Sequence, residues 1–205
     1  MAINSNPTRA LKHVATFTAT GNYVVPQNTS IIFVSVHSST GGSGGGGTPR
    51  YSGNGIPGST FSGASGLGRV SGAFISVNPG GTYPVTIGAG GTAGAGAPGF
   101  NQTGGVGGTG GTTSFDSAIS LAGSAGGGGG LRYASGPAGA GAPTATGSTS
   151  LTALPPAGAI VRTGTISNQT TGATSGTAGR EQTNRYTVPG VAGAVGSAGI
   201  VHIYV

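Results

Sequence analysis

This sequence lacks cysteine and tryptophan, and only 5% of its residues are charged, so that charged side chains for chemistry are scarce. Without cysteine the chain forms neither a disulfide bond nor a thiolate metal site. Asp116 and Glu181 are its only acids, and nothing in the sequence suggests that they form the carboxylate pair of a glycosidase. Lys12 is the only lysine, which excludes a phosphate-binding P-loop. These absences predict a protein that is not an enzyme and binds no cofactor.

Histidine is also scarce, and the three histidines offer no spacing typical of a metal site. They are His13, His37 and His202, of which His202 is expected to face solvent or to pack at a sheet edge. Residues 94–99 satisfy the glycine pattern of a dinucleotide-binding loop. That pattern requires a helix behind it, and Pro98 among glycines prevents one. No nucleophile-elbow motif appears that would support a serine hydrolase.

The net charge of +6 comes from basic residues that are spread singly between Arg9 and Arg185. Nucleic-acid-binding proteins normally cluster such residues on one face, so the sequence predicts no nucleic-acid partner. The N-terminal residues have no apolar run typical of a secretory signal, and no stretch approaches the length of a membrane span. We therefore expect synthesis in a cytoplasm and no membrane insertion.

Residues 1–13 read as an irregular leader. Two interpretations stand side by side: a frayed terminus, or an anchor arm that docks on a partner. In the second interpretation, Arg9 and Lys12 are the candidate anchor residues.

Glycine is abundant, with 47 of 205 residues, about three times the average share of roughly 7%. In several stretches it recurs with a period of three, most clearly over residues 104–112 and 190–199. A period of three matches a polyproline-II-type helix, whose glycine edge allows close packing with neighbouring helices. The runs are too short and too poor in proline for collagen. We expect several short helices of this kind stacked in one domain.

Runs of β-branched and aromatic residues between the glycine stretches predict short strands. Residues 14–37 predict a small antiparallel meander. Residues 70–77 and 82–87 predict a hairpin, and residues 113–121 another short strand. The last strand, residues 200–205, is expected to pair with residues 31–36. The predicted fold is mostly β and irregular: short antiparallel strands plus a sandwich of polyglycine-II-type helices, with essentially no α-helix.

The predicted organisation is a leader, residues 1–13, followed by a single glycine-rich domain, residues 14–205. Within that domain, residues 131–189 lose the strict glycine period and are expected to form long loops. Loops of that length are uncommon unless they are functional or disordered.

The order of these pieces resembles the glycine-rich domain of bacteriophage tail-fibre and virion proteins. The resemblance covers about residues 14–205, and its most specific stretch is residues 78–91, NPGGTYPVTIGAGG. Further matching pieces are GNYVVP at residues 21–26, GGSGGGG at residues 41–47, GGTTSF at residues 110–115 and GIVHIYV at residues 199–205.

The resemblance implies short strands joined to a sandwich of polyglycine-type helices, and a location in the virion. In the related adhesins of T-even-like phages, loops at the far end of that sandwich bind the bacterial surface. It therefore implies a tail-fibre tip adhesin whose partners are other virion proteins and a host surface glycan or outer-membrane protein, with a homotrimer as the expected assembly. The short leader differs from those adhesins and keeps a capsid decoration or head-fibre protein as the alternative. An extracellular ice- or matrix-binding protein ranks third, because the chain has no secretory signal and no disulfide.

Aromatic residues next to the glycine stretches divide into two groups. Phe61, Phe100 and Phe115 are expected to seal small cores, and Asp116 to cap a turn. Basic and tyrosine side chains in the predicted loops are the candidate contacts with a receptor or a neighbouring subunit, because Tyr and Arg are favoured at binding hot spots. The candidate contacts are Arg50, Tyr51, Arg132, Tyr133, Arg162, Arg185 and Tyr186. Solvated loop residues are the alternative for each of them.

Overall fold

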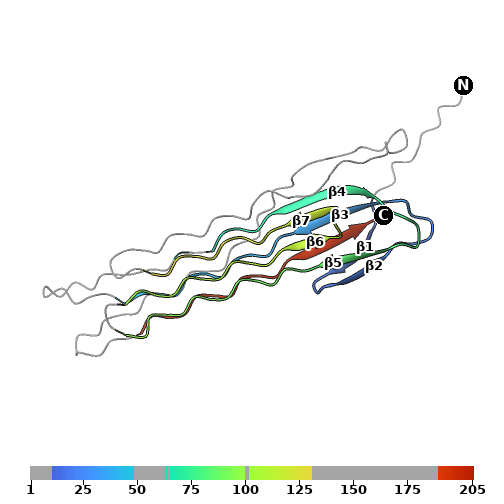
Figure 1. The fold of residues 1–205 in the computed structure, drawn as a ribbon. Helices are drawn as coiled ribbons and strands as arrows, with labels where there is room; N and C mark the ends of the chain where they lie inside the picture. Colours follow the sequence, from blue (N-terminus) through green and yellow to red (C-terminus); the bar gives the residue numbers. More distant parts are fainter. Residues whose placement is uncertain (1–10, 49–62, 64, 100–101, 131–188) are drawn as a thin grey trace, which may run out of the picture.

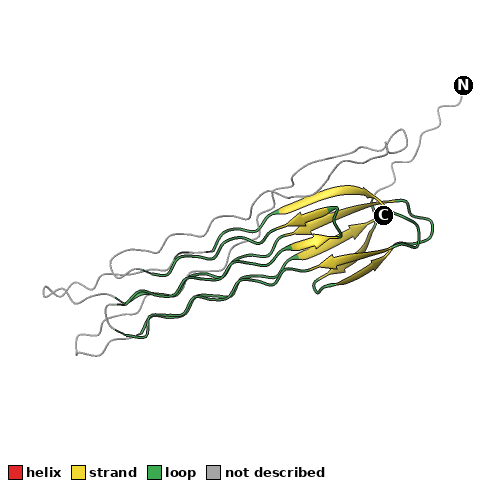
Figure 2. Cartoon of the chain, viewed as in Figure 1, coloured by secondary structure: helices red, strands yellow, loops and turns green. Residues whose placement is uncertain are grey.

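The structure is a computed structural model that describes residues 11–48, 63, 65–99, 102–130 and 189–205. Eight strands and no helix occur in this part of the chain (Figure 2), which agrees with the predicted fold class. In chain order the strands are β1 (His13–Phe17), β2 (Gly21–Val24), β3 (Ile31–His37), β4 (Val70–Ser76), β5 (Thr82–Thr86), β6 (Thr113–Phe115), β7 (Ile119–Leu121) and β8 (Ile200–Tyr204).

Four of the strands form an antiparallel sheet, sheet A, in the order β1-β8-β3-β4. The last strand β8 lies between β1 and β3, with Val34 opposite Ile203 and Thr16 opposite His202. The predicted pairing of residues 200–205 with residues 31–36 is therefore confirmed. Both strands alternate between buried and half-buried residues, as expected for strands that have one face on a core.

The other four strands form sheet B, in the order β2-β5-β6-β7. The predicted meander over residues 14–37 is wrong, because β1, β2 and β3 do not pair with one another: β2 pairs with β5 in sheet B. The predicted hairpin of residues 70–77 and 82–87 is also wrong. The turn at residues 78–81 is present, but the chain crosses there from β4 in sheet A to β5 in sheet B.

The predicted strand over residues 113–121 is in fact a hairpin of two strands, β6 and β7. Asp116 lies in the turn between them, as expected, with a positive φ of 47°. Its amide donates a hydrogen bond of 2.7 Å to the carbonyl oxygen of Pro84. Asp and Asn tolerate this left-handed conformation better than most residues.

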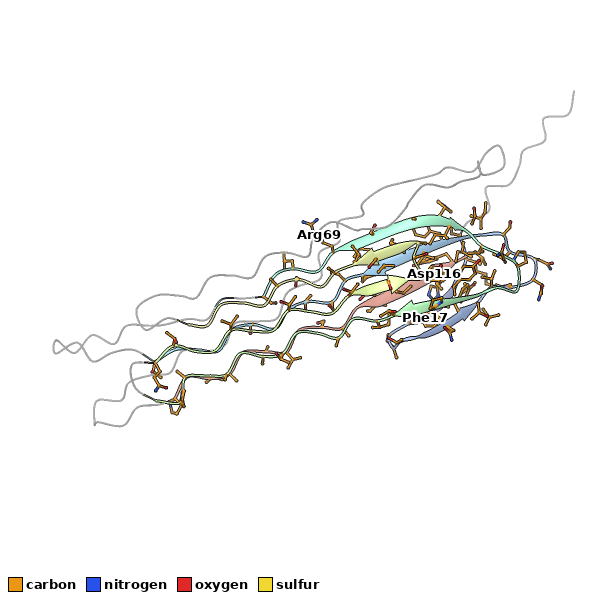
Figure 3. All side chains as sticks on the ribbon, viewed as in Figure 1. Phe17, Arg69 and Asp116 are labelled. Carbon is orange, nitrogen blue, oxygen red and sulfur yellow. The ribbon has the colours of Figure 1, made fainter. Side chains whose placement is uncertain are left out.

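The two sheets face each other across a small apolar core. Sheet A contributes Ile32, Val34 and Ile203, and sheet B contributes Phe115 and Leu121, all of them almost completely buried. The expectation that Phe115 seals a core is confirmed, whereas Phe61 and Phe100 lie outside the described residues. This core is confined to one end of the molecule, where most of the larger side chains gather (Figure 3).

Six glycine-rich segments extend from the sheets as a bundle of extended chains that are neither helix nor strand (Figure 1). Three outward segments leave β3, β5 and β7, and three return segments lead into β4, β6 and β8. The outward segments are residues 38–48, 88–99 and 122–130; the return segments are residues 63–69, of which residue 64 is not described, residues 102–112 and residues 189–199.

Main-chain hydrogen bonds join neighbouring segments at every third residue. The amides of Gly42, Gly45 and Thr48, for example, donate to the carbonyl oxygens of Gly108, Gly105 and Gln102 at 2.9 Å each. The same interval joins the other neighbouring pairs, in parallel where two outward segments meet and antiparallel where an outward segment meets a return segment. The glycine period in the sequence is thus the period of the hydrogen bonds in the bundle.

Residues 38–48, the central segment, are bonded to all five other segments and are buried along their whole length. Close contact explains the glycines there. A Cβ atom on Gly42 would overlap the carbonyl oxygen of Thr92, and one on Gly45 would overlap that of Ala95. Any side chain at these positions would push the segments apart.

Buried hydroxyl groups add further bonds between the segments. Ser39 donates to the Gly111 carbonyl oxygen at 2.6 Å. Ser124 accepts from the Gly41 amide at 2.9 Å and donates to the Gly66 carbonyl oxygen at 2.6 Å. Serine thus replaces glycine where a small side chain fills a space and satisfies a polar main-chain group that water does not reach.

Candidate functional site

The bundle has two different ends, and the end away from the sheets is here called the far end. Several of the contact residues predicted from the sequence follow, along the chain, residues that lie at this end. Thr48 and Gln102 are bonded there, as are Gly190 and Ala97. Gly130 lies beside them through a bond from Gly104 of 3.0 Å. Residues 48, 99, 102, 130 and 189, each at one end of a described stretch of chain, therefore all lie at the far end.

Thr48 holds the far end together. Its hydroxyl group donates to the carbonyl oxygen of Gly99 and accepts from the amide of Gln102 at 3.1 Å. Its own amide donates to the carbonyl oxygen of Gln102 at 2.9 Å. Although only 2% of Thr48 is exposed, its polar groups are thus bonded, and the two sides of residues 100–101 are fixed to the central segment.

Most of the predicted contact residues cannot be placed from the structure. Arg50, Tyr51, Arg132, Tyr133, Arg162, Arg185 and Tyr186 lie outside the described residues, as does the candidate anchor Arg9. Lys12, the second candidate anchor, is exposed at the sheet end. Its amide and carbonyl groups bond those of Val205 at 2.7 and 2.9 Å, extending the pairing of β1 with β8.

Sequence analysis missed a second site, on the outer face of sheet A, where all three histidines of the chain meet. His202 on β8 lies between His13 on β1 and His37 on β3, with ring centroids 5.8 and 5.2 Å away. Of the two expectations for His202, packing at a sheet edge is wrong, because β8 is an inner strand; its side chain lies on the outer face of the sheet, where it is half-buried. We call these three residues the histidine group.

The hydroxyl group of Thr16 connects two members of the histidine group. Thr16 Oγ1 lies 2.8 Å from Nε2 of His13 and 3.0 Å from Nδ1 of His202. The hydroxyl group has one proton to donate. In the neutral state, one imidazole nitrogen therefore accepts from Thr16 and the other donates to it.

Aromatic rings continue the histidine group across the face of sheet A. The ring of Tyr204 lies 5.2 Å from that of His13 and 5.9 Å from that of Phe33. Phe33 in turn lies 5.1 Å from Phe74 on the edge strand β4. Beside Phe33 a close contact requires glycine, because a Cβ atom on Gly72 would lie 2.6 Å from the phenyl ring.

The surroundings of His37 and His202 oppose protonation. Burial, and then the positive charge of His202, lower the pKa of His37 below its ordinary value. Burial, and then the charge of His13, lower the pKa of His202 in the same way. At neutral pH these imidazoles are accordingly uncharged, which suits a surface of packed rings.

Neither a candidate metal site nor a candidate membrane span is found among the residues that the structure describes. Within the described ranges, no three or more His, Cys, Asp or Glu side chains are grouped so that they could hold a metal ion. The residues placed by the structure also contain no helix long and apolar enough to cross a membrane. Residues 88–99 and 102–112, on both sides of the undescribed residues 100–101, are extended and contain no helix.

Comparison with known proteins does not assign the chain to a family. The sequence matches no protein-family model, and no curated protein matches it either.

Proposed function

We propose that this chain is a structural protein of a bacteriophage particle, most specifically the receptor-binding adhesin at the tip of a tail fibre. The observation that carries the proposal is the separation of the two ends of the domain. Lys12 and Val205 are bonded to each other at the sheet end, whereas Thr48, Gln102 and Gly190 lie at the far end. Such a rod suits attachment at one end and presentation of loops at the other.

The glycine segments serve in this proposal as polyglycine-II helices that form a rigid shaft. Support comes from hydrogen bonds at every third residue between neighbouring segments, since a polyglycine-II helix has three residues per turn and no internal hydrogen bonds. The expected circular dichroism spectrum has no helical minima, and its melting is cooperative. A spectrum of plain random coil without a cooperative melt would contradict the ordered shaft.

The loops that leave the far end supply the receptor contacts in this proposal. Arg50 and Tyr51 follow Thr48 directly in the sequence, and Arg132 and Tyr133 follow Gly130. Tyrosine and arginine suit a glycan or an outer-membrane protein, because both present a planar group together with hydrogen-bond donors.

The direct experiment adds the purified protein to host cells before infection. Bound protein should cover the receptor and reduce the number of plaques, and the double variant R50A/Y51A should lose much of this protection. Lys12→Ala, which changes an exposed cation at the sheet end, is the matched control and should protect as well as the unchanged protein. Absence of both cell binding and protection would contradict the adhesin.

The alternative remains a capsid decoration or head-fibre protein with a structural role. It is favoured by the exposed Lys12 beside the main-chain pairing with Val205, a place suited to docking on a lattice of other virion proteins. Quantitative mass spectrometry of purified particles separates the two functions. A copy number equal to that of the major capsid protein supports decoration, and a few copies per particle support the fibre tip.

A further inference from the structure

The histidine group lies where it can control a single strand. β1 is an edge strand, and in sheet A it pairs only with β8. Its pairing is interrupted by a register shift between His13 and Ala15. β8, in contrast, is held on both sides, by β1 and by β3. A repulsive force between β1 and β8 would therefore act first on β1.

Protonation supplies such a force, because it places like charges on neighbouring strands. His202 would carry a positive charge between those of His13 and His37, each with its ring centroid within 6 Å. Charges this close repel each other noticeably even when partly screened by water. Thr16 could no longer donate its proton to either ring, since both nitrogens facing it would be donors themselves.

The described surroundings contain no acidic side chain that would offset these charges. On β1 and β8 the other ionisable side chains are Lys12, next to β1, and Tyr204. β3 contributes His37 alone, and Arg69 is the residue just before β4. Asp116, the one acid among the residues that the structure places, lies in the β6–β7 turn of sheet B.

We propose that the histidine group is an acid-sensitive latch, which holds edge strand β1 against β8 when the imidazoles are neutral and loosens it when they are protonated. The consequence is local, because the apolar core and the glycine bundle contain no histidine. The proposal does not depend on the function proposed above.

The direction of the effect follows from the ionisation of the folded state. The pKa values of His37 and His202 are lowered on folding, mainly by burial. The unfolded or opened state then binds more protons over the range from the lowered pKa values up to the ordinary value near 6.5. The latch is therefore fully closed when the pH is above the ordinary histidine pKa. It weakens as the pH falls through the lowered pKa values of His37 and His202.

Native-state hydrogen exchange tests the latch strand by strand. Protection factors, corrected for the intrinsic pH dependence of exchange, are compared at about pH 7.5 and about pH 5, a range in which histidine is the side chain that normally titrates. We expect the bonded amides of β1 to lose protection at the lower pH, because the opened state binds more protons there. The amides of β5 and β6 in sheet B should change little. Unchanged protection of β1, or an equal loss in both sheets, would overturn the proposal.

Two variants identify the groups responsible. His13→Gln removes the exposed imidazole on β1 without opening the core. It should reduce the acid-induced loss of protection, because it removes the repulsion between His13 and His202 and leaves the burial of His202 unchanged. Asp116→Asn is the matched control: it removes an acidic side chain from sheet B, keeps a side chain that tolerates the positive φ, and should leave the loss intact. A full acid response in His13→Gln would contradict the latch, and so would its disappearance in Asp116→Asn.

Discussion

The α-carbon of Gly42 faces the carbonyl oxygen of Thr92 so closely that a Cβ atom has no room between the two segments. The amide of Gly42 donates to Gly108 and its carbonyl oxygen accepts from Gly127, at 2.9 Å in both cases. One residue without a side chain thus touches three neighbouring segments. Close contacts of this kind explain why glycine is so frequent in the bundle, whose described residues form no helix or strand.

Gly42→Ala is therefore expected to destabilise the domain. The added methyl group must separate two hydrogen-bonded segments, and inserting a methyl group into a well-packed interior costs about 1–3 kcal/mol or more. The free energy of unfolding, measured by chemical denaturation, reports the effect. Gly99→Ala is the matched control, because a Cβ atom there would lie 3.7 Å from Gln102, an ordinary contact. Equal stability of the two variants would contradict the packing argument.

A second prediction concerns the phenol of Tyr23, which is buried between the sheets with 7% of the residue exposed. Its hydroxyl group is buried without a hydrogen-bond partner, and burial raises its pKa. An unsatisfied buried polar group costs about 1–3 kcal/mol. Tyr23→Phe should therefore raise the free energy of unfolding by about 1 kcal/mol, as measured by denaturant titration.

Tyr83 provides the comparison for Tyr23. Its hydroxyl oxygen accepts a hydrogen bond of 2.8 Å from the amide of Asn78. Tyr83→Phe should lower the free energy of unfolding by about 0.5–1.5 kcal/mol, the net contribution of a typical hydrogen bond. If both phenylalanine variants changed stability in the same direction, the two hydroxyl groups would not differ as the structure indicates.

The strands were predicted from the sequence better than the sheets they form. Runs of β-branched residues over 31–36 and 200–205 predicted β3 and β8 and their pairing, and in the structure both strands place every second residue in the same core. The turn at residues 78–81 was also recognised. A turn motif, however, does not specify whether the next strand pairs with the previous one or crosses to a facing sheet. The assignment of β4 and β5 to different sheets was therefore missed.

The sites were predicted less well, for a related reason. His13, His37 and His202 are far apart in the sequence, and they meet only because β8 inserts between β1 and β3. The pairing of residues 200–205 with residues 31–36 was predicted without a register, and only the register in the structure, with His202 opposite Ser35, puts His37 and His202 on the same face. The contact residues of the loops, and the identification of the segments as polyglycine-II helices, stay predictions.

A third prediction tests the bonds of Thr48 at the far end. Thr48→Val keeps the shape of the side chain but removes the donor to Gly99 and the acceptor of the Gln102 amide. We expect faster hydrogen exchange at Gln102 and a loss of about 0.5–1.5 kcal/mol in the free energy of unfolding, the net contribution of a typical hydrogen bond, because these bonds are only partly buried. The exposed Thr103 is the control, since Thr103→Val should alter neither quantity much. Unchanged exchange at Gln102 in Thr48→Val would show that the hydroxyl group does not hold the far end.

The last prediction concerns Ser124, whose side chain is completely buried between three segments. Its hydroxyl group satisfies the amide of Gly41 on the central segment and the carbonyl oxygen of Gly66 on a return segment. Ser124→Ala would leave both main-chain groups buried without a partner, which costs about 1–3 kcal/mol for each unsatisfied group. Ser124→Gly should be at least as destabilising, because the position needs a hydroxyl group and not merely a small residue. Ser197→Ala changes an exposed serine and should stay within about 0.5 kcal/mol of the unchanged protein. If chemical denaturation gave Ser124→Ala the same free energy of unfolding as Ser197→Ala, the hydroxyl group of Ser124 would not contribute to the stability of the bundle.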